Sequence, residues 1–199
     1  VSDLIGRRAV FITCLAIFGI GSLFVAEVAY DARGGLAGVL YNLSFRLNGE
    51  RPEPGNIALL TIILGRVVQA LGAGALVPVA LALVGDLFPP RRRAQPLGLV
   101  GAIDTLGWVL GHLYGGIMVA AFAAGAPAFA DLFARLGLNW DVPDWRWLFW
   151  INIPITLVAM GLTWWALRDV KSERAHGRFD WLGALLISGA LVLLVVGLG

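Results

Sequence analysis

Long apolar stretches alternate with short polar segments along the chain. Residues 9–26 contain no charged side chain, and further stretches of the same kind follow after each polar connection. About 20 residues of α-helix cross a bilayer core of about 30 Å, since each residue rises about 1.5 Å. The pattern therefore predicts an all-α membrane protein with five transmembrane helices, at residues 8–29, 56–88, 95–123, 147–167 and 181–199.

Two of the polar connections are long and are predicted to be external loops. Residues 30–56 contain the apolar segment LAGVLYNLSF, which predicts a short helix at the membrane interface. Residues 124–145 contain an amphipathic piece at residues 129–136. The second span is longer than one bilayer crossing, so we expect it to tilt, protrude or bend at Pro78.

Lysine and arginine are distributed unequally between the two sides of the predicted bundle. The segments 1–8, 89–97 and 168–180 together contain nine of these residues, whereas the longer connections on the other side contain five. Cytoplasmic connections are enriched in Lys and Arg, so these three segments are predicted to be cytoplasmic, in a multi-pass protein of the plasma membrane.

Composition supports the membrane assignment and excludes several other classes. Of the residues, 59% are hydrophobic and 14% are charged, where a soluble domain has about 25% charged residues. A net charge of +2 gives no argument for nucleic-acid binding. The single cysteine, Cys14, cannot form a disulfide within the chain, and no metal-ligand spacing or catalytic pairing occurs. No enzyme, cofactor or metal site is predicted. Because the chain starts at Val1 without a signal-peptide pattern, we expect a piece of a longer protein.

One arginine lies inside an apolar span. Arg66 is about ten residues into the second span, near the middle of the bilayer, and Gln69 shares its helix face. A charge at that depth costs several kcal/mol and usually marks function. Arginine keeps its proton, so Arg66 needs a carboxylate, a substrate or water as partner. We expect Arg66 and Gln69 to serve transport or proton coupling; the alternative is a structural arginine bound to backbone carbonyls.

The third span contains an aspartate and a histidine. Asp104 is also about ten residues into its span. Burial disfavours an ionised carboxylate and a nearby arginine favours it, so a carboxylate between the two effects can bind and release a proton. Asp104 is thus a candidate proton or cation site, with helix packing as the alternative. His112 is a further candidate because imidazole titrates near neutral pH, although a lone histidine more often makes one local hydrogen bond.

Glycines form a ladder on the same span. Gly107, Gly111 and Gly115 recur every fourth residue, and Gly116 follows. Small residues at this spacing allow membrane helices to approach closely. We expect the ladder to pack within the chain, which is a simpler explanation than a dimer.

Five motifs follow one another in the order VSDLIGRR, GRVVQALGAGA, GWVLGHLYGG, DWRWLFWINIPI and FDWLG. In this order they resemble segments of the major facilitator superfamily, specifically its fourteen-helix drug:proton antiporter branch. The segments are the turn between helices two and three, helix four, helix five, the start of helix six and the entry to helix seven. The matching positions are Asp3, Gly6, Arg7, Arg8, Arg66, Gln69, Gly72, Gly107, Gly111, Gly115, Gly116, Trp145, Arg146, Trp147, Asn152, Pro154, Asp180 and Gly183.

The resemblance implies that the five spans are helices three to seven of a transporter with two six-helix halves and a central cavity opened alternately to each side. Residues 1–167 would belong to the N-terminal half, and residues 168–199 would be a cytoplasmic loop and the start of a linker helix. The resemblance also implies a conformational latch at Asp3, Gly6, Arg7 and Arg8. Where the family has a proline in helix five, this chain has His112.

The expected function is proton-coupled export of amphipathic, drug-like molecules, with the bilayer, protons, the substrate and the remaining helices as partners. The block from LALVGDLFPP to LGHLYGG, with FWINIPIT, is also similar to mycobacterial members of the branch that export triacylglycerides, so a lipid cargo is an alternative. A structural membrane protein without transport is a second alternative. Charges at bilayer depth argue against it, because a scaffold does not require them.

Overall fold

The computed structural model describes residues 6–28, 34–138, 142–168 and 180–198. In this part of the chain five helices are long and apolar enough to cross a membrane, which confirms the predicted all-α membrane fold. These helices are α2 (Arg7–Ala26), α4 (Pro54–Leu87), α5 (Ala94–Arg135), α6 (Trp147–Ala166) and α7 (Trp181–Leu198).

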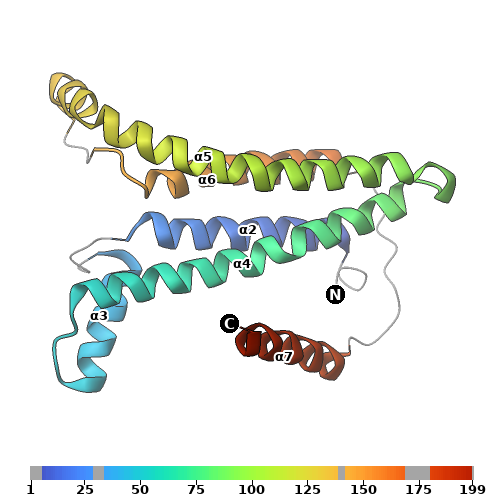
Figure 1. Ribbon diagram of the computed structural model, residues 1–199, viewed down its shortest axis with the longest axis horizontal. Coiled ribbons are helices and arrows are strands. Elements are labelled where there is room, and N and C mark those ends of the chain that lie inside the picture. Colours follow the sequence, from blue (N-terminus) through green and yellow to red (C-terminus); the bar gives the residue numbers. More distant parts are fainter. Residues whose placement is uncertain (1–5, 29–33, 139–141, 169–179, 199) are drawn as a thin grey trace.

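Helix α2 is at the centre of the packing, and it contacts α4 on one side and α6 on the other. Helix α5 lies over α4 and approaches it most closely near the turn that joins the two, as Figure 1 shows. The three-residue 3₁₀ helix η1 (Pro90–Arg92) forms part of this turn. The bundle therefore has a tightly packed side around α2 and a more open side beneath α5.

Helix α3 (Gly35–Asn48) confirms the short helix predicted in the first long connection. It packs Ala37 against Ile57 at the start of α4, and Leu40 and Tyr41 add to this small apolar cluster. Figure 1 shows α3 directed away from the long axis of the bundle, at the end opposite the α4–α5 turn. A helix across the bundle axis at this end fits the predicted interfacial position.

The predicted end of the third span was wrong. Helix α5 continues through the expected loop to Arg135, and its 42 residues correspond to a length of about 63 Å. Most residues from Ala123 to Ala130 are alanine, with Gly125 and Pro127 among them. Alanine has the highest helix propensity of any residue, so the composition of this segment favours a helix. Pro127 lies inside the helix without ending it. The amphipathic piece is thus the last part of α5.

Helix α7 stands apart from the other helices. None of its residues is buried, and Figure 1 shows it separated from α4 and α2. Asp180 lies directly before it and accepts a hydrogen bond from the backbone N–H of Gly183 (2.8 Å), as a helix-capping side chain does. Residues 180–183 of the matched segment FDWLG therefore lie at the start of the last apolar helix, as predicted, and Phe179 lies outside the described residues.

Candidate functional site

Among the described residues, α2 and α4 make the most extensive helix contact, and glycines make it possible. A Cβ atom placed on Gly72 would lie 2.5 Å from the carbonyl oxygen of Cys14 and 2.5 Å from the amide nitrogen of Phe18. A Cβ on Gly21 would collide with the backbone of Gln69 and Gly65. The two backbones can approach this closely only because these positions have no side chain.

A chain of polar side chains crosses this contact. The Nη1 atom of Arg66 donates to Oε1 of Gln69 (2.8 Å), and Nε2 of Gln69 donates to Oγ of Ser22 on α2 (2.8 Å). Gln69 is 6% exposed and Ser22 is fully buried. A buried amide must be hydrogen-bonded to avoid a large desolvation penalty, and both ends of the Gln69 amide are bonded here. Gln69 therefore fixes Arg66 relative to α2.

A third helix also contacts Arg66. Its guanidinium carbon lies 5.1 Å from the ring centroid of Phe149 on α6, within the range of a cation–π interaction. The guanidinium is thus held by α4 on one side and α6 on the other. The Arg66 side chain is nevertheless exposed.

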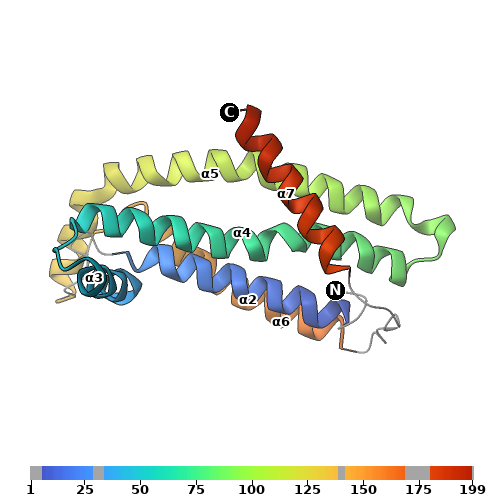
Figure 2. The same ribbon diagram turned by 90° about the horizontal axis from the view of Figure 1, so that it is seen from below.

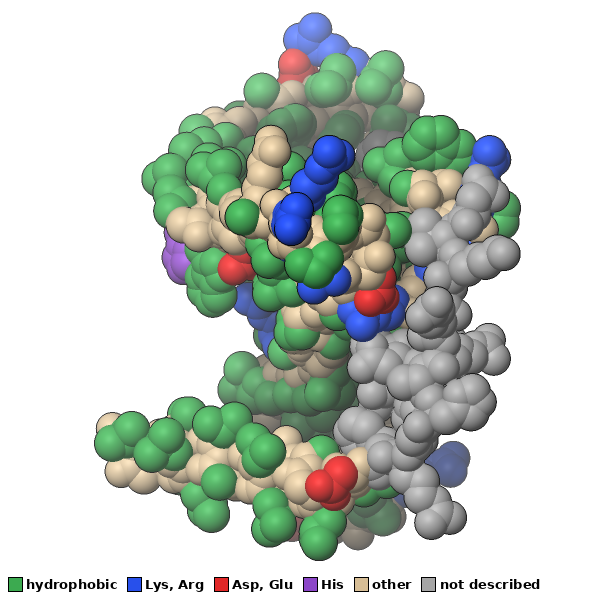
Figure 3. Space-filling view, turned by 90° about the vertical axis from the view of Figure 1, so that its right-hand side faces the viewer, with side chains coloured by type: hydrophobic (Ala, Val, Ile, Leu, Met, Phe, Trp, Pro, Cys, Tyr) green, Lys and Arg blue, Asp and Glu red, His purple; other side chains and the backbone are tan. Residues whose placement is uncertain are grey.

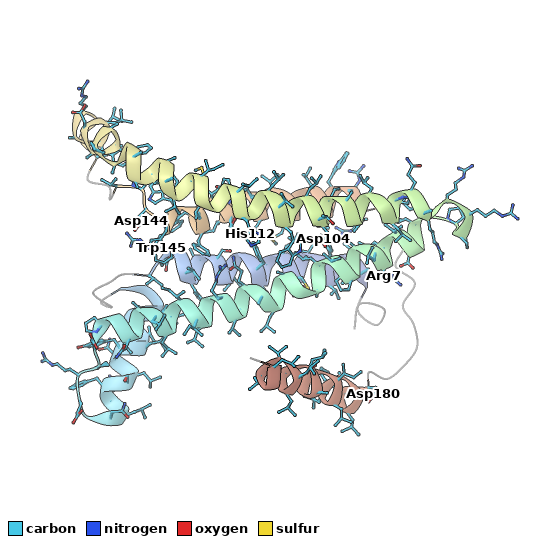
Figure 4. The ribbon with its side chains drawn as sticks, in the orientation of Figure 1. Arg7, Asp104, His112, Asp144, Trp145 and Asp180 are labelled. Carbon is cyan, nitrogen blue, oxygen red and sulfur yellow. The ribbon has the colours of Figure 1, made fainter. Side chains whose placement is uncertain are left out.

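An open cleft of about 700 Å³ lies between α2, α4 and α5, and it contains three of the four predicted coupling residues. Figure 4 shows Asp104 and His112 directed from α5 towards α2 and α4. The fourth residue, Gln69, is buried behind Arg66. The cleft is lined by Phe18, Arg66, Ile103, Asp104, Gly107, Trp108, Gly111 and His112.

The carboxylate of Asp104 has no hydrogen bond or ion pair with any residue that the structure describes, and Arg66 is not its direct partner. Both nevertheless line one cleft. The cleft therefore contains a fixed cation, Arg66, and a carboxylate without a described partner, Asp104. Such a cleft can accept a proton, a cation or a polar substrate group.

His112 makes the single local hydrogen bond that is common for a lone histidine. Its Nδ1 lies 2.7 Å from the carbonyl oxygen of Trp108, one helical turn earlier, and the two rings are stacked with centroids 6.2 Å apart. A carbonyl oxygen only accepts hydrogen bonds, so Nδ1 has the hydrogen, and Nε2 of the neutral ring is an acceptor. This acceptor belongs to the cleft.

The glycine ladder of α5 does not pack against another helix in the described part of the chain. A Cβ at Gly107, Gly111, Gly115 or Gly116 would meet no described atom within 4 Å. The prediction of intrachain packing was therefore wrong for the described part of the chain. Gly107 and Gly111 instead form part of the cleft wall.

The predicted latch residues lie at the end of the bundle where α4 joins α5. Gly6 precedes α2 with φ +109°, a conformation that favours glycine. Arg7 pairs with Asp86 near the end of α4 (2.8 Å), and Arg8 lies over the Trp164 ring of α6 at 5.1 Å. Figure 4 shows Arg7 at this end. These contacts join three helices, whereas Asp3 lies outside the described residues.

The helix-six motif closes the opposite end. Arg146 donates to the carbonyl oxygen of Val28 (3.1 Å) after α2 and to the carboxylate of Asp144 (2.8 Å). Trp145 packs edge-to-face on Phe149, the ring that also contacts Arg66. Figure 4 shows Asp144 and Trp145 together at this end. The motif thus supports the position of Phe149.

Sequence reasoning missed Ser22, Phe149 and Asp86. Ser22 is 47 residues from Gln69, and no local pattern indicates such a partner. An Asp in an apolar context shortly before the Pro89–Pro90 break was a usable signal for Asp86, since a charge there needs a partner. Gly21 and Gly65 were also missed, although each sits in an apolar helix where small residues mark close contacts.

Comparison with known proteins gives one consistent result. The family model of the Major Facilitator Superfamily matches residues 1–198. A probable triacylglyceride transporter of Mycobacterium leprae is 36% identical over 99% of this chain and 30% of its own length. A triacylglyceride transporter of Mycobacteroides abscessus is 32% identical over 99% of this chain and 29% of its own. One from Mycobacterium tuberculosis is 39% identical over 69% of this chain and 23% of its own.

The chain spans less than a third of the length of these relatives. No solved structure matches. Since the family model covers the chain from its first residue to its last but one, and since the relatives align over nearly all of it, the chain belongs to the Major Facilitator Superfamily.

Proposed function

We propose that the protein to which this chain belongs is a transporter that moves a neutral lipid of the triacylglyceride type across a membrane. The observation that carries the proposal is the identity of 32–36% over 99% of the chain to relatives named triacylglyceride transporters. This favours the lipid cargo over the drug-like cargo that the motifs alone suggested.

The chemistry of the cleft supports this cargo. A triacylglyceride presents long apolar chains and ester carbonyl groups that only accept hydrogen bonds. Phe18, Ile103 and Trp108 supply apolar walls, and the guanidinium of Arg66 supplies donors at a fixed place. Apolar walls with few well-placed polar groups are typical of sites for such ligands.

A second candidate, export of a lipophilic cation, is favoured by Asp104. Its carboxylate faces the cleft and is not paired with any described residue, so it suits a cationic ligand. In either case Asp104 is the proposed proton site, with Arg66 and Gln69 as positioning residues and His112 as an additional acceptor. Movement of two halves would be coordinated at the end where Arg7 pairs with Asp86, which we place in the cytoplasm.

In this proposal residues 1–167 form part of the N-terminal half of the transporter, and α7 starts a linker. The proposed location is the plasma membrane. No described residue of α7 is buried, which is consistent with a helix whose main packing surface is covered by another part of the protein.

The test is transport by the full-length protein in proteoliposomes with an imposed proton gradient. A fluorescent triacylglyceride and a fluorescent lipophilic cation are supplied separately, and the wild type is compared with Asp104→Asn. Asp131→Asn is the matched control, because Asp131 is an exposed carboxylate on the same helix that pairs only locally with Arg135.

We expect gradient-dependent lipid movement that falls at least about tenfold in Asp104→Asn, as for loss of a general proton-transfer group, and remains in Asp131→Asn. Movement of the cation without the lipid would replace the lipid cargo with the second candidate. Equal transport by Asp104→Asn and the wild type would reject Asp104 as the proton site.

A further inference from the structure

A second cavity lies outside the cleft that contains Arg66 and Asp104, at the turn between α4 and α5. Its volume is about 1230 Å³. Figure 3 looks onto this end of the molecule and shows arginine side chains, in blue, at the turn. The lining of the cavity includes Leu87, Phe88, Arg91, Arg92 and Leu99.

The three consecutive arginines of the turn have different roles. Arg93 donates to the carbonyl oxygens of Gly85 (2.6 Å) and Phe88 (2.9 Å), so it satisfies the last turn of α4 and fixes the shape of the connection. Arg91 and Arg92 are exposed, and their side chains have no hydrogen bond or ion pair with any described residue. Two guanidinium groups thus remain available on a turn whose backbone is hydrogen-bonded by the third.

The lining combines positive charge with an apolar wall. No aspartate or glutamate lines the cavity, and the nearest acidic residue along α4, Asp86, is paired with Arg7. Leu87 and Phe88 contribute apolar surface from the end of α4, and Leu99 contributes it from α5. Because the turn joins two membrane helices, we place its arginines near lipid head groups and the apolar wall closer to the acyl chains.

We propose that this cavity binds an anionic phospholipid of the adjoining leaflet, with its phosphate on Arg91 and Arg92 and an acyl chain along Leu87, Phe88 and Leu99. Arginine matches phosphate geometry with paired N–H donors. Basic pockets between membrane helices are suited to anionic head groups. This lipid would be a structural lipid bound at the turn, distinct from any substrate in the cleft that contains Arg66 and Asp104.

The experiment measures lipid binding by the full-length protein, purified in a neutral detergent. Phosphatidylglycerol and phosphatidylcholine with the same acyl chains are titrated, and bound lipid is counted by native mass spectrometry. Three variants are compared: Arg91→Gln with Arg92→Gln, Arg91→Lys with Arg92→Lys, and Arg46→Gln with Arg51→Gln. The last pair removes the same charge from exposed positions at the opposite end of the molecule.

We expect phosphatidylglycerol to bind more tightly than phosphatidylcholine. Each arginine contributes to the free energy of binding an anionic lipid. Loss of both arginines should therefore weaken phosphatidylglycerol binding by about 30-fold. The lysine variant should retain most of the affinity, and the control pair should change it less than about twofold. Lipid binding by the double lysine variant would also show that the turn still folds when Arg91 and Arg92 are replaced.

Three results would overturn the proposal. The first is equal affinity for the two lipids, and the second is an equal loss in the control pair, which would indicate bulk charge. The third is displacement of the lipid by millimolar inorganic phosphate, which would indicate a site for a free anion. The readout is binding, so these outcomes do not depend on whether the protein transports lipid.

Discussion

The two glycine-rich regions of this chain have opposite surroundings. Between α2 and α4, Gly21, Gly65 and Gly72 are in direct contact with the backbone or side chains of the facing helix. On α5, the regular ladder from Gly107 to Gly116 meets nothing within 4 Å among the described residues. The more regular pattern therefore belongs to the open side of the bundle, and the less regular one belongs to the packed side.

This difference teaches that glycine spacing indicates where another backbone can approach and does not identify which one. At the α2–α4 contact the approach is accompanied by the buried pair Gln69–Ser22, so shape and hydrogen bonding support each other. On α5 the glycines are accompanied by Asp104, His112 and exposed apolar residues such as Trp108. A face with these properties is suited to a cavity or to helices from another part of the protein.

The largest expected effect is on the packed glycines. Replacing Gly72 by alanine puts a Cβ 2.5 Å from backbone atoms of α2, and neither backbone can move aside without separating the helices. Overpacking of this kind costs about 1–3 kcal/mol. We expect a lower midpoint of thermal unfolding for the full-length protein in detergent, measured by intrinsic tryptophan fluorescence.

Gly111→Ala is the matched control, because both substitutions gain the same helix propensity of up to about 1 kcal/mol. The added methyl group at position 111 meets no described atom, so the unfolding midpoint should stay equal or rise slightly. A loss as large as that of Gly72→Ala would mean that helices beyond this chain cover the α5 ladder, and the contrast between the two regions would then hold only within the chain.

The next effect concerns the polar chain across the packed contact. Gln69→Ala leaves the hydroxyl of Ser22 buried without its partner and should reduce the free energy of unfolding by about 1–3 kcal/mol. Adding Ser22→Ala to Gln69→Ala should recover part of this loss, and the double-mutant cycle measures the coupling. On the open side, Asp104→Asn should change stability by less than about 0.5 kcal/mol, because no described residue bonds its carboxylate.

Additive effects of Gln69→Ala and Ser22→Ala would contradict this account of the contact. They would show that the two side chains do not depend on each other for hydrogen bonding.

Local sequence patterns were sufficient to predict five membrane-length helices and to single out Arg66, Asp104 and His112, which line the cleft, but not the contacts between helices. Arg66 and Asp104 were found because a charge in an apolar stretch is conspicuous, and both line the cleft. The partners Ser22 and Phe149 are an ordinary serine and an ordinary phenylalanine in apolar helices, and only the packing of α2 and α6 against α4 brings them to Gln69 and Arg66. Such contacts are set by the whole bundle.

The error at the end of α5 has a different cause. Gly125 and Pro127 both have low helix propensity in water, which by itself favours a loop in this segment. The surrounding alanines favour the helix, and in a membrane helix the backbone groups freed by proline can be satisfied in other ways. Helix and loop signals were therefore balanced in this segment, and the helix prevailed.

The smallest expected effect is at the charged end of the bundle, where the ion pair of Arg7 and Asp86 joins α2 to α4. Its counterpart on the open side, Arg135 with Asp131, lies within α5 and joins no helices. The side chain of Asp86 is 49% exposed, so solvent screens the pair and its coupling free energy should be about 0.2–1 kcal/mol. A double-mutant cycle with Arg7→Gln and Asp86→Asn, followed by thermal unfolding at low and high salt, measures it. The coupling should decrease at high salt, because screening weakens exposed pairs.

For Arg135→Gln with Asp131→Asn we expect at most about 0.5 kcal/mol, the value of an exposed pair four residues apart on one helix. If the pair within α5 proved the stronger of the two, the charged end would contribute little to holding α2 against α4, and the contrast between the packed and the open side would not extend to their ion pairs.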